Sequence, residues 1–320
     1  MNISNKTAPS EFILLAFSDL FKWHFFLSGL MIFTYFFTVM GNALIVFLVF
    51  SEPNLQTPMY FFLSNLSVLD ICLNTTTIPQ LIVNLLSGRS VIAYERCKIQ
   101  LFFYVLFVGS EFLLLGVMAY DRYVAICNPL HYIMVMSQKL CSQLLSAIWL
   151  ISSLNSTIHT VFTFSLLLCR GNKINYFYCD ISPLLAISCG NISRSTNAIL
   201  ATSPIMGLAP AMCIVISYIC IISRILKMNS SAAMRKAIST CASHFIVVLL
   251  YCGSCLFSYI RPTSSYSLNR DSIVALVNNV ISPILNPLIY TLRNKDVKEA
   301  LQNIMRKKLF SCKTKCFGSY

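Results

Sequence analysis

The chain has 320 residues, of which 57% are hydrophobic and only 11% are charged. This composition excludes an ordinary water-soluble protein, in which about a quarter of the residues carry charge. The formal net charge of +13 would suit nucleic-acid binding in a soluble protein. In a membrane protein, clustered basic residues meet anionic lipid headgroups instead. We therefore expect membrane lipids, and no nucleic acid, among the partners.

The N-terminal segment, residues 1–24, precedes the first long apolar stretch. Asn2 and Asn5 each begin an N-glycosylation sequon, which predicts a glycosylated, extracellular N-terminus. The apolar patch at residues 12–17 is short and lacks a preceding basic region, so it does not resemble a cleaved signal peptide. We expect the first membrane helix to direct insertion.

Seven long, predominantly apolar stretches with almost no charge follow, and each is at least as long as the ~20 residues that a membrane-spanning helix needs. They are residues 25–50, 59–86, 99–120, 140–168, 195–223, 237–260 and 272–292. This pattern predicts an all-α membrane protein with a seven-transmembrane helix bundle over residues 25–292.

An odd number of spans places the two termini on opposite sides of the membrane. With the N-terminus outside, fourteen Lys and Arg residues fall on the cytoplasmic side and ten on the outer side, as the positive-inside rule requires. In the tail, residues 293–320, Val297, Leu301, Ile304 and Met305 recur at helical spacing among basic residues. The spacing predicts a short cytoplasmic interfacial helix; the alternative is a solvated basic tail.

Four of the fourteen cysteines lie where an oxidising exterior would place them: Cys97, Cys169, Cys179 and Cys189. Four cysteines allow three pairings, and the residues alone do not choose among them. The four histidines are scattered, and no metal-ligand spacing or recognisable catalytic nucleophile is present. The sequence therefore predicts no enzyme, no cofactor and no zinc site.

Two ionisable residues, Asp70 and Glu111, fall inside predicted spans, where a charge costs several kcal/mol. Asn42 can share a polar network with them. One interpretation is a hydrated site that binds a cation such as sodium and rearranges during switching; the other is polar contact between helices. Such residues also occur along ion pathways, so a channel or transporter is a rival function. Against it, the two halves of the chain show no internal repeat.

One face of the third span carries a stripe of residues that step by four and three positions. The stripe consists of Tyr104, Val108, Glu111, Leu115, Met118 and Arg122. Its ends lie about 27 Å apart at the rise of a helix, so Tyr104 belongs near the outer mouth and Arg122 near the cytoplasm. Asp121 and Arg122 can hold a closed state there until a partner displaces them, or they can simply anchor the helix end.

The seventh span contains two prolines, Pro283 and Pro287, which free backbone carbonyls and let a helix bend. The neighbouring Asn286 and Tyr290 are expected to bond those carbonyls or exchange partners as the helix moves.

Eight short fragments follow one another in a characteristic order. They are Gly41 with Asn42, LQTPMY at 55–60, LSVLD at 66–70, MAYDRYVAICNPLHY at 118–132, Ser217 with Tyr218, KAISTCASH at 236–244, PILNPLIY at 283–290 and RNKD at 293–296. With these fragments the chain resembles, over nearly its whole length, a rhodopsin-like G-protein-coupled receptor and, more narrowly, a vertebrate olfactory receptor. Cys252 stands where this family commonly has an aromatic residue in the sixth helix.

The resemblance implies an odorant receptor in the plasma membrane of olfactory sensory neuron cilia. Such a receptor binds a small, largely apolar volatile molecule and activates the heterotrimeric olfactory stimulatory G protein, which raises cyclic AMP. A non-olfactory chemosensory receptor is the alternative within the same class. The resemblance also implies the disulfides Cys97–Cys179 and Cys169–Cys189.

Residue roles follow from the same resemblance. The G-protein switch and its inner relay would comprise Asp121, Arg122, Tyr123, Tyr218, His244, Asn286, Pro287 and Tyr290. The ligand pocket would be lined by Tyr104, Val105, Val108, Gly109, Phe112, Ser203, Met206, Cys255 and Tyr259. These are mostly apolar with a few hydroxyls, as suits a small apolar ligand oriented by one or two hydrogen bonds. Tyr104 replaces the aspartate of amine receptors, which disfavours an ammonium ligand.

Overall fold

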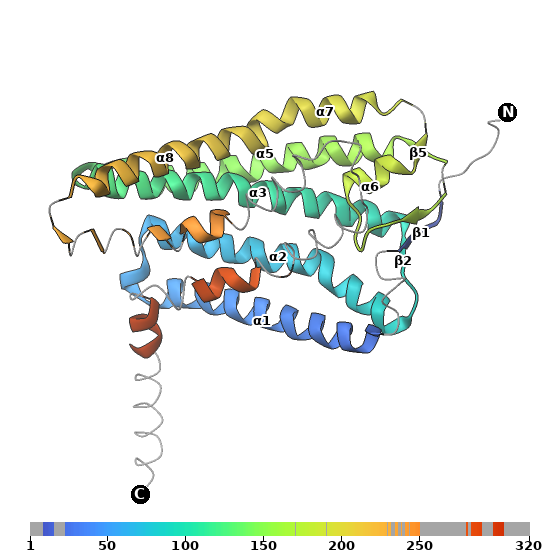
Figure 1. Cartoon of the computed structure of the whole chain (residues 1–320), viewed down its shortest axis with the longest axis horizontal. Helices are drawn as coiled ribbons and strands as arrows, with labels where there is room; N and C mark the ends of the chain where they lie inside the picture. The colour runs from blue at the N-terminus through green and yellow to red at the C-terminus, as the bar shows by residue number, and fades with distance from the viewer. Residues whose placement is uncertain are drawn as a thin grey trace, which may run out of the picture.

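A computed structural model describes most of the chain (Figure 1). The described residues are 9–15, 23–169, 171–189, 191–228, 230, 231, 234, 235, 238, 241, 242, 244–249, 280, 283–289 and 297–303.

Five helical stretches are long and apolar enough to cross a membrane. They are α1 (His24–Ser51), α2 (Pro58–Ser87), α3 (Tyr94–Cys127), α5 (Gln138–Phe164) and a continuous run of α7 (Ser193–Ser203), a π-helical segment (Pro204–Leu208) and α8 (Ala209–Leu226). They correspond to the first five predicted spans. Of these, α3 extends furthest beyond its prediction, because charged residues at its two ends continue the helix past the apolar stretch.

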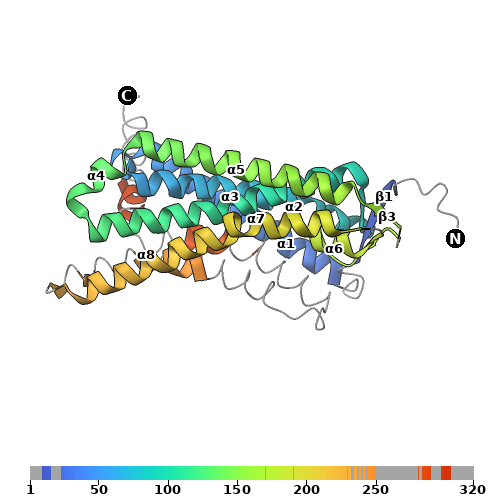
Figure 2. The same cartoon turned by 90° about the horizontal axis from the view of Figure 1, so that it is seen from above.

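The central helix of the described bundle is α3, which packs against α2, α5 and α8, while α1 packs along α2. Figures 1 and 2 show these helices running roughly alongside one another. In Figure 1, α1 and α2 lie on one side of α3, and α5 and α8 lie on the other. The outer side of α1 leaves large apolar side chains such as Phe25, Phe36 and Phe50 exposed. In a membrane-spanning helix such a surface meets lipid tails.

Parts of the last two predicted spans are also helical. Residues 244–249 lie within the sixth and residues 283–289 within the seventh. Residues 297–303 form a further helix at the predicted place, with Val297 and Ala300 buried against the bundle. Figure 1 shows this short dark-red helix running across the direction of α1. Ile304 and Met305, which we assigned to the same helix, lie outside the described residues.

Short strands at one end of the bundle are an addition to the all-helical prediction. The first strand, β1 (Glu11–Leu14), lies between an antiparallel neighbour, β2 (Val91–Ala93), and a parallel one, β4 (Lys173–Ile174). A second pair joins β3 (Leu167–Leu168) to β5 (Ser188–Cys189), and α6 (Ile181–Ala186) lies between them in the chain. We call the strands, α6 and the loops that join them the cap.

The buried residues of β1 explain why the chain start joins the cap. Phe12 and Leu14 are buried in a hydrophobic cluster that also contains Ile92 and Ile174 from the neighbouring strands. Alternate residues of a strand point to the same face, so β1 places both apolar side chains inward. The apolar patch that we judged too short for a signal peptide thus includes residues that form the cap.

Candidate functional site

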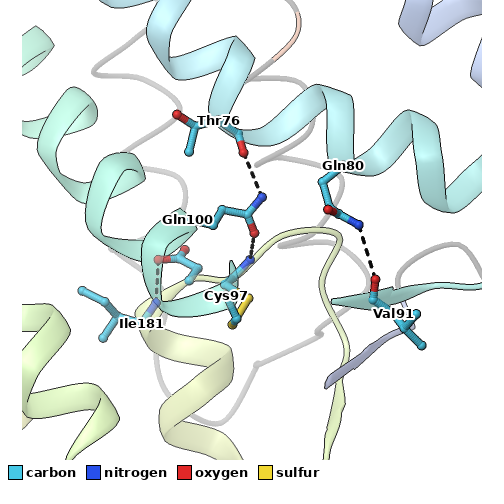
Figure 3. Close-up of a disulfide and its surroundings, with 8 residues drawn as sticks. Thr76, Gln80, Val91, Cys97, Gln100 and Ile181 are labelled. Carbon is cyan, nitrogen blue, oxygen red and sulfur yellow. Dashed lines mark hydrogen bonds between the residues drawn. A yellow bond between two sulfur atoms is a disulfide. The ribbon is translucent and has the colours of Figure 1, made fainter. Parts of the chain in front are cut away.

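The cap is joined to α3 by a disulfide and by one buried amide. Cys97, in the first turns of α3, is bonded to Cys179 in the loop before α6, and Cys169 is bonded to Cys189. Figure 3 shows Gln100 beside the first disulfide. Its Nε2 donates to the Thr76 carbonyl of α2 at 2.9 Å, and its Oε1 accepts from the Cys179 backbone N–H at 2.9 Å. Two helices and the loop therefore meet at Gln100.

An aromatic contact continues from the cap into the bundle. The Tyr178 hydroxyl donates to the Tyr104 hydroxyl at 2.8 Å, and the two rings lie 4.6 Å apart between centroids. Burial, with the neighbouring Tyr104 as a smaller cause, raises the pKa of Tyr178 well above its ordinary value. Tyr178 is therefore a neutral hydrogen-bond donor. Tyr104, which we predicted at the outer mouth, is held by the loop that covers it.

Below Tyr104, α3 approaches the fifth span closely. A Cβ atom built on Gly109 would lie 2.5 Å from the Met206 methyl carbon and 3.6 Å from the Ser152 hydroxyl. Met206 belongs to the π-helical segment, a distortion that often occurs at functional sites. Only glycine fits at residue 109 without displacing the Met206 side chain. The structure thus brings together two of the predicted pocket residues.

The other predicted pocket residues divide into three groups. Val105, Val108 and Phe112 are partly buried on α3, as a pocket lining requires. The Ser203 side chain is exposed, and its hydroxyl donates to the Leu200 carbonyl of its own helix at 3.2 Å. Cys255 and Tyr259 lie outside the described residues.

The intramembrane polar network joins α2, α3 and the seventh span. The Asn286 amide donates to both Asp70 carboxylate oxygens, at 3.1 and 3.0 Å, and Glu111 hydrogen-bonds Asp70 from α3. Two carboxyl groups in contact must share a proton or a cation to avoid repulsion. Carboxylate oxygens also suit a hard cation such as sodium. The described residues contain no group of three or more His, Cys, Asp or Glu side chains that could hold a metal.

Asn42 shows how the bundle accommodates the proline in the seventh span. Pro287 has no N–H, so the carbonyl of Pro283, four residues earlier, loses its helical partner. Asn42 Nδ2 donates to that carbonyl at 3.1 Å. We expected Asn286 or Tyr290 to bond the freed carbonyls; Asn286 instead bonds Asp70, and Tyr290 lies outside the described residues.

At the far end of α3, three switch residues are placed by specific contacts. Tyr132, from the short helix α4 (Tyr132–Val135), donates its hydroxyl to Asp121 Oδ1 at 2.8 Å. Tyr218 on α8 hydrogen-bonds His244 Nδ1 at 2.8 Å, and its hydroxyl donates to the Cys241 carbonyl at 3.2 Å. Arg122 is only 6% exposed, and among the described residues its Nη2 has no hydrogen-bond partner.

Comparison with known proteins decides the class of the chain. A sequence model described as olfactory receptor matches residues 31–308. Olfactory receptor 1G1 of gorilla is 44% identical over 305 residues, which cover 95% of this chain and 97% of the relative. Human olfactory receptor 1C1 is 42% identical over 307 residues, covering 96% and 98%. The chain belongs to the olfactory receptor family.

Comparison with solved structures supports the fold of this olfactory receptor. Squid rhodopsin superposes with a TM-score of 0.66 at 17% sequence identity, covering 98% of this chain and 93% of the rhodopsin chain. The predicted seven-helix membrane bundle is thus confirmed. The family also confirms the prediction of an odorant receptor coupled to G proteins, rather than an enzyme.

Sequence reasoning missed several residues of this olfactory receptor. Gln100, Tyr132 and Tyr178 were not predicted, because their hydrogen-bond partners lie elsewhere in the sequence and no periodic pattern marks them. Three strongly exposed apolar residues after α3 were also missed: Leu130 at 91%, Ile133 at 84% and Met134 at 71%. They could have been noticed as apolar side chains in a loop, next to the switch motif.

Proposed function

We propose that this receptor binds a small, largely apolar volatile odorant between α3 and the fifth span, and activates the olfactory stimulatory G protein. One observation carries the proposal: α3 runs unbroken from Tyr104, which contacts the cap, to Arg122 among the switch residues. A ligand that alters the packing of α3 against α8 acts on both ends of one rigid element. The predicted contacts with Ser203, Cys255 and Tyr259 are part of this proposal.

The proposed mechanism is a shift of populations between two arrangements of the helices. Ligand contacts favour an arrangement in which the sixth helix moves outward near His244, breaking the Tyr218–His244 hydrogen bond and opening a groove beside Arg122. Differential affinity of a few kcal/mol is enough to change a mostly inactive ensemble into a substantially active one. Asn286, Pro287 and Tyr290 are proposed to move with this change, and Tyr123 to line the opened groove.

The exposed apolar residues after α3 suit a protein partner at the same end. Leu130, Ile133 and Met134 leave large apolar surfaces uncovered directly after the switch motif, and exposed apolar patches commonly mark interaction sites. The α4 residue Tyr132 fixes them to α3 through Asp121. We propose that the G protein contacts these residues together with Arg122, and that its activation raises cyclic AMP.

We also propose an orientation and a location for the chain. The cap lies outside the cell, with Asn2 and Asn5 glycosylated, and the helix at 297–303 lies along the cytoplasmic surface, where the basic tail meets anionic lipids. The receptor is placed in the plasma membrane of olfactory sensory neuron cilia.

The central test expresses the receptor with the olfactory G protein and a cyclic AMP reporter, and screens diverse volatile compounds. Arg122→Ala should abolish the response to every active compound while surface labelling stays unchanged. Arg224→Ala is the matched control, because Arg224 is an exposed arginine in the last turn of α8. An undiminished response in Arg122→Ala cells would reject the assigned switch.

A further inference from the structure

The chain contains seven N-glycosylation sequons, which are the pattern Asn-X-Ser/Thr in which X is not proline. They begin at Asn2, Asn5, Asn65, Asn74, Asn155, Asn191 and Asn229. An asparagine can carry an oligosaccharide only if it lies on the outer side of the membrane and is accessible to water. Residues 2, 5 and 229 lie outside the described residues, so the structure distinguishes among the other four sequons.

Three of these four asparagines lie inside membrane helices. Asn65 and Asn74 are in α2, and each amide donates to a backbone carbonyl of the same helix, at 2.8 and 3.3 Å. Asn155, in α5, is only 8% exposed. An oligosaccharide at membrane depth would bring many hydroxyl groups out of water, which is strongly unfavourable. These three sequons are therefore not acceptors.

Asn191 differs from these three in position and in exposure. It lies between Cys189 of β5 and the first residue of α7. Figure 1 shows that α7 begins at the same end of the bundle as β1 and β5 of the cap. The Asn191 side chain is exposed, and so are the other two residues of the sequon, Ile192 and Ser193. An oligosaccharide attached there would not enter the bundle.

The sequence of α7 indicates how far Asn191 lies from the membrane core. The helix begins with five polar residues, 193–197, and Ala198 is its first apolar residue. Seven residues separate Ala198 from Asn191, which corresponds to about 10 Å at the rise of a helix. The headgroup layer adds only about 5–8 Å to each side of the hydrocarbon core. Asn191 therefore reaches the water beyond the headgroups.

The Asn191 carboxamide leaves its nitrogen available. Its Oδ1 accepts from the Ser193 backbone N–H at 2.9 Å, whereas its Nδ2 makes no hydrogen bond with the described residues. In Asn65 and Asn74, by contrast, Nδ2 is the atom that donates to the helix. Because a glycan is attached through Nδ2, modification of Asn191 breaks no hydrogen bond within the described part of the chain.

We propose that Asn191 is an N-glycosylation site in the loop before α7, in addition to Asn2 and Asn5. The donor is a lipid-linked oligosaccharyl diphosphate. Asn191 Nδ2 forms a bond to C1 of the first sugar and loses one proton, while the bond from C1 to the diphosphate oxygen breaks and the lipid diphosphate leaves. This inference rests on the proposed orientation, in which the cap lies outside the cell.

The test expresses the full-length receptor in mammalian cells and compares its mobility on denaturing gels before and after treatment with a peptide N-glycosidase. The double variant Asn2→Gln/Asn5→Gln removes both N-terminal sequons. We expect the glycosidase still to increase the mobility of this variant, by the step of one glycan, and to have no effect once Asn191→Gln is added. Receptor retained inside the cell also carries the oligosaccharide, so the measurement does not depend on export.

Ser193→Ala and Ser193→Thr are the matched pair, each made in the Asn2→Gln/Asn5→Gln background. Both change the same exposed residue, but only threonine keeps the sequon. The alanine variant should lose the remaining glycan and the threonine variant should keep it. The same result for both variants, whether loss or retention, would overturn the proposal.

The N-terminal sequons separate this inference from the proposed orientation. If the unaltered receptor carries glycans and the Asn2→Gln/Asn5→Gln variant carries none, the N-terminus is outside and the assignment of Asn191 is wrong. If the glycan of that variant persists after Asn191→Gln and disappears with Asn229→Gln, the loop after α8 is on the outer side, which overturns both. An unaltered receptor without any glycan would reject all three acceptor asparagines.

Discussion

The two ends of the bundle are held together by different kinds of interaction. The cap combines two disulfides, a three-stranded sheet and buried apolar residues such as Phe12. The opposite end depends on single side-chain hydrogen bonds, including Tyr132–Asp121 and Tyr218–His244. Covalent links and backbone pairing keep one arrangement, whereas single hydrogen bonds can be exchanged at about 1 kcal/mol each. The difference fits the proposed mechanism, in which the cap end stays fixed and the opposite end switches.

The largest effect should come from breaking the cap. Cys97→Ser removes the disulfide that joins α3 to the loop carrying Tyr178, and loss of such a bond typically costs about 2–5 kcal/mol. We expect little folded receptor at the cell surface, measured by labelling of intact cells. Cys72→Ser is the control, because Cys72 is a free cysteine in α2. Normal surface levels of the Cys97 variant would mean that the cap holds without its covalent link.

A smaller effect should follow from removing one hydrogen bond at the inner end. Tyr132→Phe frees α4 from Asp121, and a hydrogen bond to a charged group contributes about 1.5–3 kcal/mol. We expect normal surface levels but an agonist potency for cyclic AMP that falls about tenfold, because the exposed residues after α3 are no longer held in place. Tyr120→Phe, at an exposed tyrosine on α3, should leave potency unchanged. If Tyr132→Phe instead lowers the amount of receptor at the surface, the Tyr132–Asp121 hydrogen bond is needed for folding, as the contacts of the cap are.

The smallest effect concerns the pH dependence of the cap. Burial raises the pKa of Asp180, whose carboxylate accepts from the Ile181 N–H at the start of α6, from 3.8 to about 6. The folded cap therefore binds this proton more tightly than the unfolded chain, so the contribution of Asp180 to stability falls as the pH rises from about 4 to about 6.

Asp180→Asn keeps an acceptor for Ile181 and removes the titration. The melting temperature of purified receptor, relative to this variant, should drop by roughly 2 °C between pH 4 and pH 6.5. If the difference in melting temperature between the receptor and this variant does not change with pH, or rises with pH, then burial does not raise the pKa of Asp180.

The sequence predicted the fold best where one pattern, a long apolar stretch, recurs along the chain. Apolar stretches located the five described membrane helices to within a few residues at most ends, since each needs a fixed length of apolar residues. Single motifs placed Asp121 and Arg122 together on α3. What escaped prediction depends on partners far apart in sequence: Gln100 with Thr76 and Cys179, or Asn42 with the Pro283 carbonyl. Such pairs exist only once the helices are packed.

The buried polar side of α5, which carries Ser152, Asn155 and Thr160, shows a further limit of sequence-based prediction. Its serines, threonines and asparagine read in sequence as ordinary interruptions of an apolar span. Only their orientation distinguishes Thr160, whose buried hydroxyl has no hydrogen-bond partner among the described residues, from Thr157, which bonds its own helix.

The position of β1 in the middle of its sheet has a consequence for synthesis. Residue 13 pairs with residue 91 on one side and residue 173 on the other, so this strand cannot complete its pairing until the four membrane helices between residues 13 and 173 have been made. The start of the chain is translated first and is among the last segments to settle. Throughout that interval the apolar side chains of Phe12 and Leu14 lack the neighbouring strands against which they are buried in the finished cap.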